Sequence, residues 1–406
     1  MMKWRGAMLD ISRHYFDAAF IKKTLSSLAL FDYNTLHLHL TDDQGWRLES
    51  KAFPSLHKVG SIRKHSQNNH GLLEPTFDGK EHSGYLTHDD VREIVGHAQM
   101  LGIDVVPEIN IPGHTGALLA SYPQYGINQI SVEVSGRWGI SDHLLRPFPE
   151  TFQFLEKIFQ EVASIFPSDY IHVGGDESLI DNWLKDSEVV EWMKQQDLAT
   201  TKEVFIFFMR EVEKIINGLG KKMVTWDDAF AFDPEKATNA TVMSWRGDAI
   251  AQIALEHKRE VIQSPVFPTY FDYSQEVSED EPLAIGGPVT LEDVLEFTPL
   301  PNATGVQFQL WTEYIESEIH AEYMMWPRAA ALAFRCWSDE KDFESYFNKR
   351  RLQLEKLGVT IREIDPLKRV NIAHLGIGKY FRGFDTAQMM HTLEKSAIAG
   401  EVAHDF

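Results

Sequence analysis

Residues 168–178 read SDYIHVGGDES, a β-rich run that stops at two glycines and continues into two adjacent carboxylates. Glycine lets the backbone turn sharply and approach a ligand closely. Asp176 and Glu177 would then lie at the carboxyl end of a strand, where parallel α/β folds place their chemistry. The same two acidic residues would also suit the first turn of a helix. The stretch alone therefore leaves two interpretations open, a catalytic strand end or a helix N-terminus.

Short β-rich runs alternate with amphipathic stretches along the chain. We expect strands at 6–11, 34–40, 103–109, 170–173, 222–226, 241–245, 260–264 and 306–311. Apolar residues three and four apart predict helices at 18–30, 88–101, 151–165, 201–219, 248–257 and 321–337. This alternation is typical of a (β/α)8 TIM barrel, and we predict that α/β fold class. Residues 227–240 contain Pro234 and no helical stripe, so a loop should replace the helix between the fifth and sixth strands.

The expected barrel occupies residues 1–340. Residues 341–406 are expected to form a C-terminal helical extension packed on the barrel, with a helix at 342–357 and no assigned role. The connection 41–87 is too long for a plain turn, and we expect it to build part of a binding site.

Composition excludes several classes of partner. The chain carries 60 acidic and 39 basic residues and a net charge of −21, which disfavours nucleic acid and anionic membranes. No apolar run approaches the roughly 18 residues of a membrane span, and residues 1–9 lack the apolar core of a signal peptide. Cys336 is the only cysteine, so no disulfide framework is expected. We expect a cytoplasmic enzyme, or a secreted one if a leader was removed, and allow for a homodimer.

Aromatic residues gather at the predicted strand ends. Trp226, Trp245 and Trp311 end the fifth, sixth and eighth strands, where they could line one pocket rather than fill the core. Near the first strand, Arg5 could bind ligand hydroxyls, while Arg47 is expected to be a surface cation.

The His37-x-His39 pair has two interpretations. Residues two apart on a strand point to the same face, so the pair could hold a metal ion at the barrel mouth. A metal-dependent hydrolase would add His114 and Asp176 to this set. Packed, hydrogen-bonded barrel histidines are the alternative that we favour, because no further histidine except His172 stands at the fourth to sixth strand ends.

Taken together, these runs resemble glycoside hydrolase family 20, the β-N-acetylhexosaminidases. The resemblance covers residues 4–338 and rests on RGAMLDISRHYF (5–16), LHLHLTDDQGWR (36–47), VVPEINIPGHT (105–115), IHVGGDES (171–178), VTWDD (224–228), MSWRG (243–247), YFD (270–272), LWTE (310–313) and WPRAAALAFRCWS (326–338). It implies an exo-acting, retaining enzyme that releases terminal β-linked N-acetylglucosamine or N-acetylgalactosamine from oligosaccharides or glycoconjugates, without a metal or other cofactor.

The resemblance also implies residue roles. In this family the substrate's own 2-acetamido oxygen is the nucleophile, and an oxazolinium-like intermediate forms. Glu177 would be the general acid and base, Asp176 would orient the acetamido N–H, and Tyr270 would donate to the acetamido oxygen. The remaining residues implied in substrate binding are Arg5, Asn110, His114, Trp226, Trp245, Asp272, Trp311 and Glu313, with Asp42 or Asp43 as a further candidate.

One position departs from the family pattern. Asn110 stands where the family usually has Asp, four residues before His114. Loss of that negative charge should lower the proton affinity of Glu177 and shift the acidic limb of activity downward. A sugar-binding module without catalysis remains a further alternative, although the presence of Glu177 argues against it.

Overall fold

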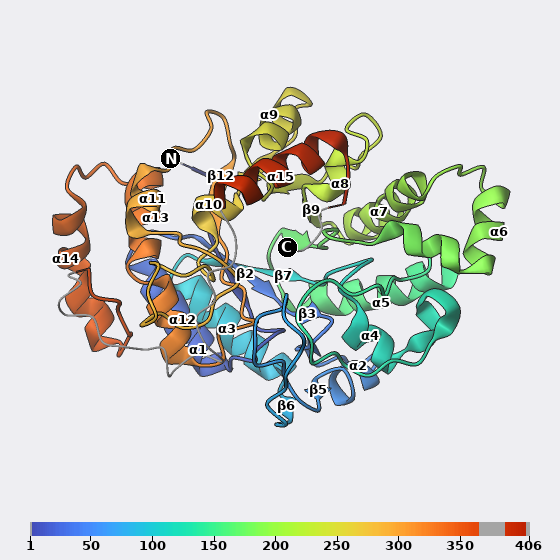
Figure 1. Cartoon of the computed structure of the whole chain (residues 1–406), viewed down its shortest axis with the longest axis horizontal. Coiled ribbons are helices and arrows are strands. Elements are labelled where there is room, and N and C mark those ends of the chain that lie inside the picture. The colour runs from blue at the N-terminus through green and yellow to red at the C-terminus, as the bar shows by residue number, and fades with distance from the viewer. Residues whose placement is uncertain (1, 365–385, 403–406) are drawn as a thin grey trace.

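Eight parallel strands close into a barrel in the computed structural model, which describes residues 2–364 and 386–402 (Figure 1). The strands are β1 (Trp4–Asp10), β2 (Thr35–His39), β7 (Asp104–Glu108), β8 (Tyr170–His172), β9 (Lys222–Trp226), β10 (Thr241–Ser244), β11 (Val261–Gln263) and β12 (Gly305–Phe308). β1 pairs with both β2 and β12 and so closes the ring. The predicted (β/α)8 TIM barrel is confirmed, and each predicted strand matches an observed one within three residues.

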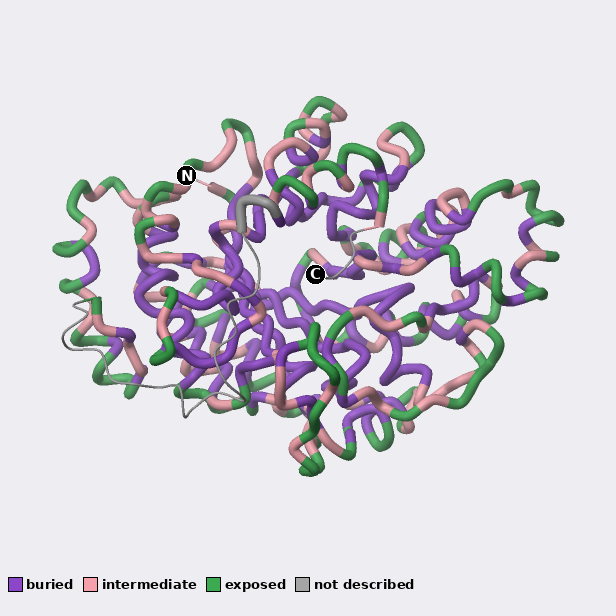
Figure 2. The backbone as a smooth tube through the Cα atoms, viewed as in Figure 1, coloured by how far each residue is buried: buried purple, intermediate pink, exposed green. Residues whose placement is uncertain are grey.

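Helices surround the strands, and each of these helices buries one of its faces against the barrel. The larger ones in the barrel are α1 (Ala18–Ala29), α3 (His88–Met100), α5 (Pro149–Ile165), α6 (Ser187–Gln195), α7 (Thr201–Gly218), α9 (Asp248–Glu256), α11 (Leu291–Glu296), α12 (Glu318–Met325) and α13 (Arg328–Trp337). Their starts follow local capping rules: Thr87 and Thr200 each form a capping box with the acidic residue three positions later. Most of the buried apolar residues belong to one large cluster, and Figure 2 shows the buried backbone, in purple, concentrated in the middle of the molecule.

Shorter elements fill the connections. They are α2 (Ser55–Lys58), α4 (Gly116–Ser121), α8 (Asp228–Ala231), α10 (Val266–Thr269), the 3-10 turns Pro123–Tyr125, Ile127–Gln129 and Ile180–Lys185, and the two-residue strands β3 (Thr41–Asp42), β4 (Gly45–Trp46), β5 (Ile62–Arg63) and β6 (His82–Ser83). The four short strands lie within the long connection 41–87.

Two predictions of helices needed correction. The continuous helix expected at 321–337 is two helices, α12 and α13, because Pro327 lacks the N–H of a helix interior and its ring clashes with the preceding turn. The expected loop 227–240 does replace a full crossover helix, but its first residues form the single turn α8.

Two described helices follow the barrel. α14 (Phe343–Lys356) contacts α13, and α15 (Thr386–Ala399) contacts α8, α9 and α10. The rest of the expected extension, 365–385 and 403–406, lies outside the described residues. Among the described helices, none combines the length and apolar character needed to cross a membrane.

Candidate active site

A cavity of about 190 Å³ opens at the carboxyl ends of the barrel strands. Its charged and titratable lining comes from strand ends and from the loops that follow them: Arg13, His70, His114, Asp176, Glu177, Asp272 and Glu313. Its aromatic lining consists of Trp138, Trp226, Trp245, Tyr270, Tyr273, Trp311 and Tyr314. The barrel therefore brings residues from distant parts of the chain into one pocket, as expected for this fold.

The turn after β8 presents the adjacent carboxylates. Gly174 and Gly175 both have positive φ angles, and a Cβ on Gly174 would overlap the side chain of Asn110. Glu177 itself has φ of 47°, a conformation that non-glycine residues adopt with strain and that is often found at functional sites. The stretch 174–177 is not helical, so the strand-end interpretation of SDYIHVGGDES holds and the helix N-terminus interpretation is wrong.

His114 connects the two carboxylates to a third. Its Nε2 lies 3.4 Å from Oε2 of Glu177 and 3.7 Å from Oδ2 of Asp176, and its Nδ1 lies 3.1 Å from Oδ1 of Asp42. Burial would lower the pKa of His114, but Asp42 and Asp176 together raise that pKa well above its usual value. The neighbouring carboxylates therefore favour the protonated form of the His114 ring.

Asn110 contacts Asp176 directly. Its Nδ2 donates to Oδ1 of Asp176 over 2.9 Å, and its Oδ1 accepts from the backbone N–H of Gly175 over 3.3 Å. Burial raises the pKa of Asp176, while His114 opposes that rise and the Asn110 amide adds to the opposition. Asn110 therefore acts on the acidity of Asp176, and its expected effect on Glu177 stays a prediction.

Hydrogen bonds fix two of the indole rings. Nε1 of Trp226 donates to Oε1 of Glu108 over 3.0 Å, and Nε1 of Trp245 donates to Oδ2 of Asp228 over 2.8 Å. The rings of Trp226 and Trp311 lie 5.8 Å apart between centroids. The three tryptophans thus form a preorganised apolar wall, as their strand-end positions suggested.

The Tyr270 ring borders this wall, with its centroid 6.2 Å from that of Trp311. Burial first, and then Asp272 and Asp176, raise the pKa of Tyr270 well above its usual value. The Tyr270 hydroxyl therefore stays protonated and can act as a hydrogen-bond donor in the pocket.

A buried cluster of charges forms another side of the cavity. The guanidinium of Arg13 lies 3.2 Å from Oδ2 of Asp10, 2.9 Å from Oδ2 of Asp42 and 3.5 Å from Oε1 of Glu313. Burial and then Glu313 raise the pKa of Asp272 well above its usual value. Oδ1 of Asp272 is buried and finds no hydrogen-bond partner among the described residues, so it is available to a ligand hydroxyl.

Arg5 does not belong to this site, which corrects the sequence-based expectation. It lies at the amino end of β1, where its Nε donates to the carbonyl of Asp32 over 2.5 Å and its Nη1 to that of Met2 over 3.0 Å. Arg13, which follows the carboxyl end of the same strand, is the arginine in the pocket. The sequence signal was present, because Arg13 stands three residues after the strand-end Asp10.

The expectation for Arg47 was also wrong. Its side chain is fully buried rather than exposed, and it donates to the carbonyls of Ser12 and Ser61. It therefore holds the loop after β1 against the connection 41–87, outside the cavity lining.

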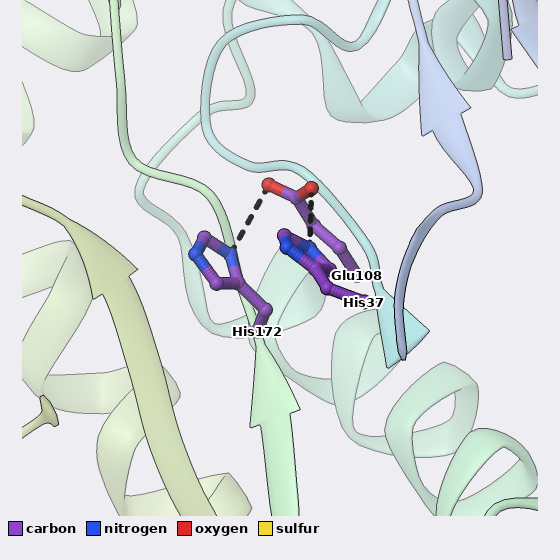
Figure 3. A group of neighbouring side chains, drawn as sticks. All are labelled: His37, Glu108 and His172. Atoms are coloured by element: carbon purple, nitrogen blue, oxygen red, sulfur yellow. Dashed lines mark hydrogen bonds and ion pairs between the residues drawn. The ribbon is translucent and has the colours of Figure 1, made fainter. Parts of the chain in front are cut away.

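The strand histidines form a buried network below the pocket. Nε2 of His37 lies 2.9 Å from Oε2 of Glu108, and Nδ1 of His172 lies 3.1 Å from Oε1 of the same carboxylate (Figure 3). Nδ1 of His39 also contacts Glu108, and its Nε2 lies 2.8 Å from Asp42. These are hydrogen-bond distances between side chains, as favoured from the sequence. His37, Glu108 and His172 nevertheless include donor atoms close enough to hold a metal ion.

Comparison with known proteins settles the family. Residues 2–340 match the model of glycosyl hydrolase family 20, catalytic domain. The chain belongs to this family.

Family 20 relatives cover most of this chain. This chain is 35% identical over 356 residues to the beta-hexosaminidase of Porphyromonas gingivalis, a match that covers 84% of this chain and 44% of the relative. It is 32% identical over 346 residues to the beta-hexosaminidase of Vibrio furnissii, a match that covers 82% of this chain and 56% of the relative. The chain thus spans about half the length of these curated relatives. A family 20 exo β-N-acetylglucosaminidase from Vibrio harveyi, solved with N-acetylglucosamine, superposes with a TM-score of 0.78 at 29% identity over 89% of this chain and 59% of that one.

The family 20 match includes the residues discussed above and ends before α14 and α15. Met389 and Leu393 of α15 nevertheless line the cavity, and so do Trp138, Tyr314 and Gly71. Sequence reasoning missed this outer part of the site, although it expected the connection 41–87, which contains Gly71, to contribute.

Proposed function

We propose that this protein is an exo-acting, retaining β-N-acetylhexosaminidase that uses the acetamido group of its substrate as the nucleophile. The single observation that carries the proposal is the approach of both carboxylates, Asp176 and Glu177, to the same Nε2 atom of His114. Oxygen atoms of the two carboxylates lie within 4.8 Å of each other, whereas an enzyme nucleophile and an acid flank the anomeric carbon about 5–5.5 Å apart. Two carboxylates around one imidazolium suit neighbouring atoms of one sugar, with one acting on the leaving oxygen and one on the acetamido N–H.

In the first step the acetamido oxygen attacks the anomeric carbon as the glycosidic C–O bond breaks. Glu177 transfers its proton to the leaving oxygen, so that the aglycone departs as a neutral alcohol. Asp176 accepts a hydrogen bond from the acetamido N–H and balances the positive charge of the oxazolinium-like ring. Tyr270 donates to the acetamido oxygen and aligns it with the anomeric carbon.

In the second step Glu177, now a carboxylate, takes a proton from water as the water oxygen attacks the anomeric carbon. The oxazolinium ring opens, and the two displacements together retain the anomeric configuration. Trp226, Trp245 and Trp311 would enclose the acetamido methyl and keep competing water away from the intermediate.

Recognition of a terminal sugar would fall to the charged cluster. Arg13, Asp272 and Glu313 offer one fork of donors and two carboxyl groups to the hydroxyls of the non-reducing sugar. Burial is the first cause of the raised pKa values of Asp272 and Glu313. Such values suit carboxyl groups that share protons with one another and with a ligand. The natural aglycone, a cytoplasmic location and a homodimer stay predictions.

Initial rates on p-nitrophenyl β-N-acetylglucosaminide and on the plain β-glucoside test the proposal. We expect cleavage of the acetamido sugar alone, at a rate that EDTA does not change. Equal rates on both sugars would remove the acetamido nucleophile. Loss of activity with EDTA would instead favour the metal-dependent alternative, at the group formed by His114, Asp176 and Glu177 or at that formed by His37, Glu108 and His172.

A further inference from the structure

Helix α15 lies across the helices that follow three neighbouring strands. It contacts α8, α9 and α10, which come after β9, β10 and β11, and it is the red helix beside α8 and α10 in Figure 1. Because α8, α9 and α10 begin just after the carboxyl ends of these strands, α15 sits at the mouth of the barrel. Two of its residues line the same cavity as the strand-end tryptophans.

The end of this helix is anchored in the barrel. Arg246, whose Nε is 2.6 Å from Oδ1 of Asp227, donates from Nη1 to the carbonyl of Glu401 over 2.8 Å. Ala397 is buried in an apolar cluster with Phe230 and Ile250. A buried ion-paired arginine and an apolar contact fix α15 as a wall in this structure.

Two side chains of α15 face the cavity. Met389 and Leu393 are four residues apart, so they lie on one face of the helix. Both are buried, at 3% and 2% exposed, and Sδ of Met389 accepts a hydrogen bond from the hydroxyl of Tyr273 over 3.2 Å. All the charged groups that line the cavity come from the barrel, and α15 adds only apolar surface.

We propose that Met389 and Leu393 are specificity-determining residues that contact an apolar surface of the leaving group. This inference rests on the proposed function, in which the terminal sugar occupies the strand ends beside Trp226, Trp245 and Trp311. A group attached beyond the anomeric oxygen must then extend outward, past the strand ends, to the level of α15. An apolar wall there favours an aglycone with an aromatic ring or an apolar sugar face, because contact removes both surfaces from water.

The test compares two substrates that share the sugar and differ in the leaving group. p-Nitrophenyl β-N-acetylglucosaminide carries an aromatic aglycone, whereas the β-N-acetylglucosaminyl fluoride has a leaving group of one atom. For Met389→Ala and Leu393→Ala we expect kcat/KM on the aryl substrate to fall about five- to tenfold, since one lost methylene-sized contact is worth roughly fourfold. Hydrolysis of the fluoride and inhibition by N-acetylglucosamine should change less than twofold.

Met390→Ala is the matched control. Met390 is the next residue on the same helix, but its side chain lines a different cavity with Phe267 and Glu296. We expect this variant to keep the wild-type ratio of aryl to fluoride rates. If an alanine variant does not fold, Met389→Gln keeps the side-chain length but replaces apolar with polar surface, and it must still lower that ratio.

Each outcome has one meaning. An unchanged aryl rate in both cavity-lining variants overturns the inference. Equal losses on the aryl substrate, on the fluoride and in product inhibition also overturn it, because α15 would then shape the sugar site. A wild-type protein that cleaves neither substrate contradicts the proposed function itself, so the two failures are distinguishable.

Discussion

The two ends of the barrel use similar residues in different ways. At the amino end of β1, Arg5 donates to two backbone carbonyls and ties the chain start to the turn after α1. Beyond the carboxyl end of the same strand, Arg13 faces three carboxylates in the buried lining of the cavity. At the amino end of β7, Asp104 accepts a hydrogen bond from Ser168, and Asn110 beyond its carboxyl end holds a pocket carboxylate.

Position along a strand therefore decides whether these polar residues serve the fold or the pocket. The carboxyl ends of all eight strands converge on one cavity, where loops from distant segments bury charges beside each other. The amino ends carry connections that satisfy backbone groups locally. A substitution at the carboxyl end should therefore lower activity, whereas the matched substitution at the amino end should act on stability alone.

The largest effect is expected for Glu177→Gln. Without the general acid, kcat should fall by roughly 10²–10⁴, and most on substrates whose leaving group is an alkyl alcohol. The matched change at the other end is Asp104→Asn, which keeps an acceptor for Ser168 and should leave kcat within twofold. Steady-state kinetics and urea unfolding of both variants check this, and more than a tenth of wild-type activity in Glu177→Gln would remove its assigned role.

An intermediate effect is expected for Arg13→Lys. An ammonium group cannot serve Asp10, Asp42 and Glu313 with the planar fork of a guanidinium, so kcat/KM should fall by about 30-fold. Arg5→Lys should change kcat/KM less than twofold, because its contacts are to the carbonyls at the opposite end. If both lysine variants lose activity equally, the distinction between the two ends fails.

The smallest effect is a shift in pH dependence for Asn110→Asp. In the proposed mechanism Asp176 is ionised when it accepts the acetamido N–H. Burial already raises the pKa of Asp176, while the Asn110 amide opposes that rise. A second carboxyl group in place of the amide would share a proton with Asp176 and raise this pKa further. The acidic limb of kcat/KM should therefore move to higher pH by about one unit.

Asn34→Asp provides the comparison at the amino end, because Asn34 precedes β2 and donates to the carbonyl of Lys3. Its acidic limb should coincide with that of the wild type. A pH–rate profile that is unchanged in Asn110→Asp would mean that the missing family Asp does not set the acidity of the site.

The sequence by itself determined the barrel and most of the pocket. Strand periodicity and glycines at the end of the run 170–173 are local properties, and they located Asp176, Glu177 and the three strand-end tryptophans without coordinates. Pro327 is a local signal for a helix break, but the regular apolar spacing on both sides of it led to the prediction of one continuous helix. The direction of β1 places Arg13, not Arg5, at the cavity end of the strand, and the position of Arg13 just after the strand-end Asp10 was the signal for it.

Only the tertiary structure decided which separate segments share the site. Arg47 became buried because two loops close around it, and α15 joined the cavity because Arg246 and an apolar cluster hold it at the barrel mouth. Such contacts join residues far apart in sequence. They stabilise the fold by burying apolar surface, and local sequence spacing does not predict which surfaces meet. Local spacing therefore specifies the elements and their ends, whereas long-range packing specifies the apolar wall that α15 adds to the cavity.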